Sequence, residues 1–234
     1  GGETETQNIA TTEPQTEEVK ATVDASEQAD VATVVDSTAL FFASKEQNYQ
    51  EGVILDNGKV QLVINPKGGM IARANLCEYR SYEHYKENLD APLYLFDETN
   101  SEMNFSFDTK DDILSLKDYY FTAENQTDTC VTMVLSHPNG ESIMLDYALL
   151  PDNYLVNFTI RAKNMQKHFA RNSDIQVDWK DCVKQQEKGY YFENMYSTLT
   201  YKLTDDDAEN LAEMENEQEK LQQPVDWIAF KNQY

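Results

Sequence analysis

Basic residues are scarce in this 234-residue sequence, which has 19 Lys and Arg residues against 42 Asp and Glu residues and a formal net charge of −23. Proteins that bind nucleic acid neutralise its phosphates with Lys and Arg, and proteins that dock on anionic lipid use clusters of the same residues. Long apolar runs are also missing, since no stretch approaches the ~18 consecutive apolar residues of a membrane-spanning helix. The sequence therefore excludes a phosphate-backbone binder, and we expect no nucleic-acid partner.

Cysteine and histidine are few, with three of each. The six residues are Cys77, Cys130, Cys182, His84, His137 and His168. No C-x-x-C pair and no H-E-x-x-H spacing occurs, so zinc ribbons and thioredoxin motifs are excluded and no metal site is indicated. An odd number of widely spaced cysteines does not fit a disulfide framework, and we expect them to be small buried apolar residues. We predict no metal and no cofactor.

Recognisable catalytic motifs are missing as well. No histidine is paired in the sequence with a nucleophile, and the 42 acidic residues make any chosen pair of carboxylates uninformative. We therefore predict that the chain is not an enzyme. Aromatic rows at Tyr79, Tyr82 and Tyr85 and at residues 190–196 favour either a groove for sugar or peptide or ordinary cross-strand packing.

The first 48 residues are rich in Thr, Gln, Glu and Ala. Ten acidic residues stand against Lys20 and Lys45 among the first 50 positions. A segment of this composition cannot bury enough apolar surface to offset the conformational entropy lost on ordering. We predict a disordered acidic linker over residues 1–48.

From residue 49 to residue 204 the sequence has the pattern of short β-strands separated by turns. Apolar residues alternate at 60–64 and at 154–160, as expected for strands with one buried face. We expect Gly68 and Gly69 to supply positive φ in a turn, and Asn139-Gly140 is a strong hairpin signal. Further strands are expected within residues 70–76, 92–96, 105–107, 119–122, 131–135, 143–149, 175–179, 190–192 and 199–203. Short strands with frequent turns predict an antiparallel sandwich.

The last region, residues 205–234, has a different composition. Residues 205–223 contain eight acidic residues and a single Lys, so we expect a solvated loop or a marginal helix there. Pro224 ends this stretch, because proline does not continue a helix. The aromatic-rich segment from residue 225 to Tyr234 follows.

Several dispersed segments resemble the large periplasmic domain of YidC-type membrane protein insertases. They are NGKV at 57–60, PKGGMI at 66–71, Tyr79, Tyr82, and APLYLF at 91–96. That family has a strand, a K-G-G turn, a second strand and a PL-x-LF segment in this order. DNYLV at 152–156 and VDWIAFKNQY at 225–234 resemble later family segments, the last one especially in its Bacteroidetes versions. The resemblance extends over residues 50–234.

The resemblance implies a mainly β fold, an antiparallel β-supersandwich similar to galactose mutarotase folds, with short helical elements at its C-terminal end. It also implies a non-catalytic domain on the periplasmic side of the bacterial inner membrane, attached through membrane helices outside this chain. Auxiliary subunits of the Sec translocon and nascent membrane proteins are the implied partners. Trp227, Ile228, Phe230 and Tyr234 would then lie near the membrane interface and help to position the membrane core, or would pack on the sandwich.

Two functions of other classes remain open. One is a carbohydrate-binding or carbohydrate-active β-sandwich, which requires a cleft with convergent polar groups. The other is a secreted adhesion or scaffolding domain on an acidic tether. A shared fold does not decide between them, because function depends on the site rather than on the fold.

Overall fold

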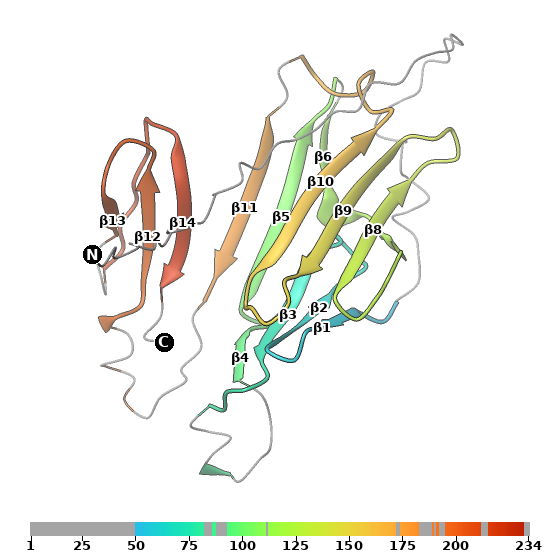
Figure 1. Cartoon of the computed structure of the whole chain (residues 1–234). Coiled ribbons are helices and arrows are strands. Elements are labelled where there is room, and N and C mark those ends of the chain that lie inside the picture. Colours follow the sequence, from blue (N-terminus) through green and yellow to red (C-terminus); the bar gives the residue numbers. More distant parts are fainter. Residues whose placement is uncertain are drawn as a thin grey trace, which may run out of the picture.

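The computed structural model describes residues 50–81, 86–87, 93–110, 112–171, 174–182, 189, 191, 195–211 and 215–231. Strands dominate the regular structure of these residues (Figure 1). The strands are β1 (Val53–Asp56), β2 (Val60–Ile64), β3 (Ile71–Leu76), β4 (Leu93–Phe96), β5 (Ser101–Asp108), β6 (Ile113–Ser115), β7 (Thr122–Glu124), β8 (Cys130–Ser136), β9 (Ser142–Leu149), β10 (Val156–Lys163), β11 (Ile175–Asp181), β12 (Thr198–Leu203), β13 (Ala208–Asn210) and β14 (Val225–Lys231). A 3-10 helix, η3 (Leu116–Asp118), lies between β6 and β7. The predicted linker, residues 1–48, lies outside the described residues.

The described strands form four antiparallel sheets, with the orders β1-β2-β3-β4, β10-β9-β8-β7, β11-β5-β6 and β13-β12-β14. The first three sheets enclose one core, which contains side chains of β1, β2, β5, β8 and β9. Figure 1 shows β10, β9 and β8 in front of the layer that contains β5 and β6. Phe105 of β5 packs on Phe158 of β10 across the layers, with 5.4 Å between the ring centroids. The predicted mainly β, antiparallel, sandwich-like architecture is confirmed.

Alternating burial explains why these segments form strands. In β9, Ile143, Leu145, Tyr147 and Leu149 are buried. The intervening residues Asp146 and Ala148 are only partly buried. Each such buried apolar side chain stabilises the fold by about 1.5–3 kcal/mol relative to an exposed one. The Tyr147 hydroxyl donates a hydrogen bond of 2.8 Å to the backbone oxygen of Gly69, which connects β9 to the β2–β3 turn.

The β2–β3 turn contains the two glycines that the sequence pattern singles out. Gly68 has φ 84° and Gly69 has φ 70°, a left-handed conformation that other residues rarely adopt. A Cβ atom on Gly69 would lie 2.7 Å from Cδ1 of Leu145, which belongs to the opposing sheet. Backbone conformation and close approach therefore both favour glycine at this position.

The region between residues 109 and 124 and the C-terminal region differ from the sequence-based expectation. Strands β1, β6, β13 and β14 are additional to the predicted ones, and residues 119–122 form no continuous strand because η3 precedes them and β7 begins only at Thr122. Of the two alternatives expected for residues 205–224, a solvated loop or a marginal helix, the described part forms no helix and is irregular apart from the short strand β13. Acidic residues four positions apart, such as Asp205 and Glu209, repel one another along a helix, which disfavours it. The aromatic segment after Pro224 forms β14 rather than a helical element.

The cysteines are less buried than expected, and one strand crosses the predicted grouping of the domains. Cys77 and Cys130 are half-buried and Cys182 is exposed, all as free thiols, so the expectation of buried cysteines is wrong. Cys77 and Cys182 directly follow β3 and β11, and Cys130 is the first residue of β8, so none lies in the interior of a strand. β12 falls inside the predicted 49–204 region but pairs with β13 and β14. The division at residue 204 itself stays a prediction.

Candidate interaction surface

The β13-β12-β14 sheet lies beside the three sheets that enclose the core (Figure 1). Tyr201 of β12 is its one buried side chain among the described residues 195–211 and 215–231. The Tyr201 hydroxyl donates a hydrogen bond of 2.8 Å to Glu209, and this bond raises the pKa of Tyr201 to about 12. Lys202 Nζ lies 2.9 Å from Asp226 Oδ2 and lowers the pKa of that carboxyl. These polar contacts join β12 to β13 and to β14, in addition to the backbone ladders of the sheet.

The two faces of β14 present different aromatic residues. Ile228 is paired with Tyr201 and Phe230 with Leu199, so these residues share one face of the sheet. Trp227 is one position out of phase and lies on the other face. Trp227 and Ile228 are exposed by 43% and 49%, whereas Phe230 is half-buried. The strand thus presents an indole on one side and an aliphatic and a phenyl group on the other.

The Phe230 face of β14 meets the main body at β11. The rings of Phe230 and Trp179 are in edge-to-face contact, with 4.6 Å between their centroids. β11 is an edge strand, and its residues Ile175, Val177 and Trp179 are exposed by 37%, 51% and 44%. Apolar side chains on an edge strand are unusual, because natural proteins generally protect such edges with charge or cover them. Ile175, Val177, Trp179, Ile228 and Phe230 together are called the β11–β14 strip below.

The apolar residues of β11 lie on the same face of the sheet as the core-facing residues of β5. They lie beyond the strands that cover β5. Ile175 is paired with Phe107 and Val177 with Phe105, and directly paired residues point to the same face of a sheet. Phe105 and Phe107 are buried, because Phe158 and Phe169 pack against them. Among the described parts of the chain, no aromatic ring packs over Ile175 and Val177 in this way, and both residues are exposed.

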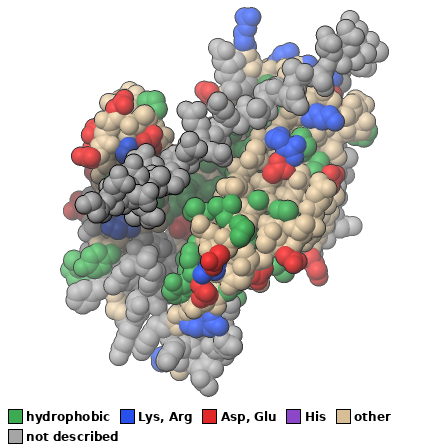
Figure 2. All heavy atoms as spheres, viewed as in Figure 1, with side chains coloured by type: hydrophobic (Ala, Val, Ile, Leu, Met, Phe, Trp, Pro, Cys, Tyr) green, Lys and Arg blue, Asp and Glu red, His purple; other side chains and the backbone are tan. Residues whose placement is uncertain are grey.

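Acidic side chains surround the strip. The described residues 195–211 and 215–231 contain eight acidic residues and three Lys, a formal charge of −5. In residues 174–182, three Asp stand against one Lys. Figure 2 shows acidic side chains gathered over the small sheet, whereas basic and acidic side chains are mixed on the main body. The strip is therefore apolar in the middle and negative at its margins.

A second cluster, away from the small sheet, surrounds a buried carboxylate. Glu141 lies in the β8–β9 turn with its side chain 2% exposed, and its Oε1 atom is 2.7 Å from Lys167 Nζ and 3.4 Å from His168 Nε2. Its Oε2 atom lies 3.5 Å from His137 Nδ1. Burial alone raises the pKa of the Glu141 carboxyl, but hydrogen bonds from Lys167, from the backbone and from His168 outweigh it and lower the pKa to about 2. We interpret the cluster as a clamp between the turn and the segment after β10.

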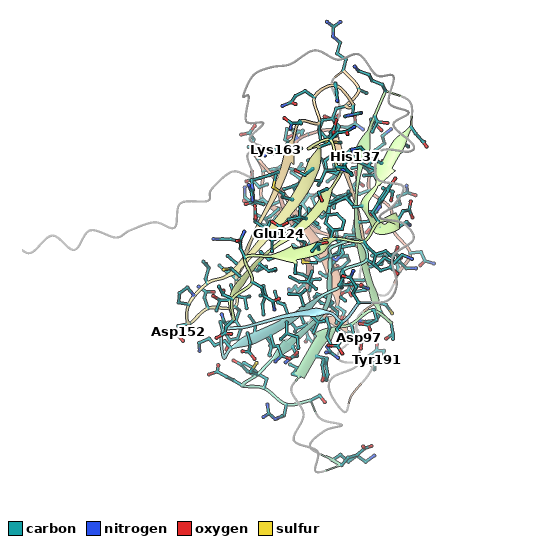
Figure 3. All side chains as sticks on the ribbon, turned by 90° about the vertical axis from the view of Figure 1, so that its right-hand side faces the viewer. Asp97, Glu124, His137, Asp152, Lys163 and Tyr191 are labelled. Atoms are coloured by element: carbon teal, nitrogen blue, oxygen red, sulfur yellow. The ribbon has the colours of Figure 1, made fainter. Side chains whose placement is uncertain are left out.

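A third cluster contains exposed aromatic residues. The Tyr79 and Tyr154 rings are 6.4 Å apart, and the Tyr154 hydroxyl donates a hydrogen bond of 2.8 Å to Glu78. Lys59 Nζ lies 3.3 Å from Glu78 and 3.3 Å from Asp152. Figure 3 shows Asp152 and His137 well apart, on different sides of the molecule, so this cluster and the Glu141 clamp are separate. Tyr82 and Tyr85 of the predicted aromatic row, and the histidine His84, lie outside the described residues.

The described part of the chain offers neither a metal site nor a membrane-spanning helix. There, no three His, Cys, Asp or Glu side chains gather closely enough to hold a metal ion. No helix in these residues reaches the length and apolar character needed to cross a bilayer. That the chain binds no cofactor stays a prediction.

The similarity to known proteins covers most of the chain. A family model described as the YidC periplasmic domain matches residues 53–234. The chain belongs to the YidC periplasmic domain family. Proteins named membrane protein insertase YidC are 41% identical to it over 202 residues in Phocaeicola vulgatus, 36% over 203 in Bacteroides fragilis and 35% over 188 in Porphyromonas gingivalis. These matches cover 86%, 86% and 79% of this chain but only 31%, 32% and 29% of the relatives, so the chain spans about a third of their length.

The predicted site residues of this YidC periplasmic domain separate in the structure. Phe230 packs against Trp179, whereas Trp227 faces the other side of β14 and Ile228 is half exposed beside Phe230. Tyr234 lies outside the described residues. Sequence reasoning missed Trp179 as a partner of Phe230, because no sequence signal connects two strands 50 residues apart. It also missed Glu141, which is one of 42 acidic residues.

Proposed function

We propose that this YidC periplasmic domain is non-catalytic and assists the insertion and folding of inner-membrane proteins from the periplasmic side of the bacterial inner membrane. The family match over residues 53–234 carries the proposal, and relatives named membrane protein insertases support it. The domain would dock auxiliary subunits of the Sec translocon and meet nascent membrane proteins. Insertion itself is assigned to the remainder of the whole protein, because the chain spans about a third of the relatives.

In this role, the C-terminal segment positions the membrane core. The exposed indole of Trp227 supports a location near the membrane interface, where amphipathic aromatic residues are enriched. Phe230 would hold the segment to the main body through Trp179. Both roles that the sequence leaves open for these residues, interface contact and packing, are thereby combined on the two faces of one strand.

The first test replaces Trp227 by Ala in the full-length insertase that contains this domain. We expect reduced complementation of an insertase-depleted strain at an unchanged protein level, because the interface anchor is lost while the buried Tyr201 is untouched. Tyr79→Ala is the matched control, since Tyr79 is a comparably exposed aromatic residue (51%) on the main body. Full complementation by Trp227→Ala at normal protein level would contradict the positioning role.

A second test addresses the docking of partners. The full-length insertase is purified from membranes with residues 50–234 present or deleted, and co-purifying proteins are identified by mass spectrometry. We expect translocon subunits to depend on the domain. If the same subunits appear after its deletion, the docking role is wrong and the domain serves as a spacer.

A further inference from the structure

We propose that the β11–β14 strip binds an extended polypeptide segment that has alternating apolar residues and is flanked by Lys or Arg. The segment would pair with the free edge of β11 and lay its apolar side chains over Val177, Trp179 and Ile228. This peptide-binding activity goes beyond the proposed insertase role and does not depend on it, because it rests on two edge strands and their charge.

Two features of the backbone support strand addition. Among the described strands, β11 borders only β5 and β14 borders only β12, so each has one edge without a strand neighbour there. Alternate N–H and C=O groups of an edge strand point away from its neighbour, and they form a template for an added strand. Among the described residues, no ladder joins β11 to β14, which meet through the Trp179 and Phe230 side chains. The edge of β11 therefore offers backbone groups directly beside exposed apolar side chains.

The side chains favour a peptide with apolar residues at every second position. Ile175, Val177 and Trp179 alternate with Gln176, Asp178 and Lys180 along β11, so one face is apolar and the other polar. Residues of an added strand would alternate in the same way, and those on the apolar face would meet Val177 and Trp179. Ile228 is exposed on the same face of β14 as Phe230, the residue that contacts Trp179.

The negative charge around the strip favours one kind of binding partner over the others. The described small sheet has a formal charge of −5 and residues 174–182 have a charge of −2, so flanking Lys or Arg residues are attracted. The same charge disfavours anionic lipid as the occupant of the strip, which lies on the face of β14 opposite Trp227. A second copy would bring an equally acidic strip, and the first 50 residues of this chain contain ten acidic residues against two Lys. A basic, apolar peptide is the complementary partner.

The test uses the two tryptophans of the chain, Trp179 and Trp227. In a Trp227→Phe variant of the whole chain, the fluorescence of Trp179 alone reports on the strip. The probe is a synthetic peptide of alternating Val and Thr residues with Lys at both ends. We expect a saturable blue shift, because the added strand removes Trp179 from water. In the reciprocal Trp179→Phe variant, Trp227 on the other face of β14 should shift little.

Matched substitutions locate the binding edge. Val177 on β11 and Ile54 on β1 are both 51% exposed and both belong to edge strands. Val177→Asn should weaken peptide binding about 10-fold, as expected for the loss of one apolar contact. Ile54→Asn should leave the affinity unchanged. Equal affinities for the two variants would place binding elsewhere and overturn the proposal.

Three further probes distinguish the mode of binding. A peptide with alternate backbone amides methylated cannot donate to β11 and should bind at least 10-fold more weakly; equal binding would exclude strand addition. A peptide with Glu in place of Lys should also bind more weakly; equal binding would exclude charge selection. A Trp179 shift with phosphatidylglycerol vesicles but not with the peptide would assign the strip to the membrane, and dimerisation without peptide in sedimentation would assign it to a second copy.

Because this assay uses the chain alone, it can fail while complementation by the full-length insertase succeeds. A Val177→Asn variant that loses peptide binding and still complements would leave the insertase role intact. A Trp227→Ala variant that fails to complement but binds peptide would leave the strip intact. The two proposals are therefore tested separately.

Discussion

The main sandwich and the β13-β12-β14 sheet are both built from antiparallel strands but bury their apolar side chains to different extents. In the sandwich, Leu135, Ile143 and Leu145 are 0% exposed, whereas in the described small sheet Tyr201 alone is buried and Ile228 is 49% exposed. Apolar burial is the dominant favourable term in folding, so the sandwich should supply most of the stability. The small sheet keeps apolar side chains at its surface, which is typical of an interaction site.

The largest expected effect is on the sandwich. Leu145→Ala should lower the free energy of unfolding by about 2–5 kcal/mol, because it removes a fully buried side chain and leaves a cavity between the layers. Leu155→Ala is the control, since Leu155 is 62% exposed and should change stability by less than about 0.5 kcal/mol. Urea unfolding measures both. Similar losses for the two variants would mean that the core is not where the structure places it.

The next effect separates backbone strain from close packing. Gly69→Ala should cost about 2–4 kcal/mol, because it combines an unfavourable φ of 70° with a Cβ atom 2.7 Å from Leu145. Gly58→Ala provides the comparison, since Gly58 has φ 84° with nothing within 4 Å of an added Cβ. It should cost only about 1–2 kcal/mol from strain. Equal losses in urea unfolding would contradict the close approach of the β2–β3 turn to β9.

The Glu141 clamp should make stability depend on pH. The pKa of Glu141 is lowered to about 2 in the folded chain from its ordinary value of 4.5, so its contribution is present above pH 4.5 and is lost as the pH falls through 2. Glu141→Gln should lower the free energy of unfolding at pH 7 by about 1–3 kcal/mol, because the buried clamp loses its charge. The difference between Glu141→Gln and the parent protein should shrink as the pH is lowered toward 2.

The control for the clamp is an exposed carboxylate with similar partners. Glu78 is hydrogen-bonded to Tyr154 and Lys59, and these contacts lower its pKa, but its side chain is 51% exposed. Glu78→Gln should therefore change the unfolding curve little at either pH. A pH-independent loss for Glu141→Gln would show that its packing matters rather than its charge.

The sequence predicts the sandwich better than the site, for physical reasons. Alternation at residues 60–64 and 143–149 marks buried faces directly, so β2 and β9 are found where expected. β14 is missed because Trp227, Ile228 and Phe230 form an apolar run without alternation. The exposure of β11 is missed for another reason. Its residues alternate as in a strand with one buried face, and only the structure reveals that no opposing layer among the described residues covers Val177.

The smallest expected effect concerns the contact between the two regions. Trp179→Ala and Phe230→Ala should each destabilise the chain modestly, and a double-mutant cycle should give a coupling of about 0.5–1.5 kcal/mol, the range for aromatic pairs. Trp179→Ala with Trp227→Ala is the control cycle, because Trp227 lies on the other face of β14 and should show no coupling. If the first cycle also gives zero, the small sheet is not held by this pair. A clear coupling would mean that an edge contact attaches the small sheet while most of the surrounding apolar strip stays open.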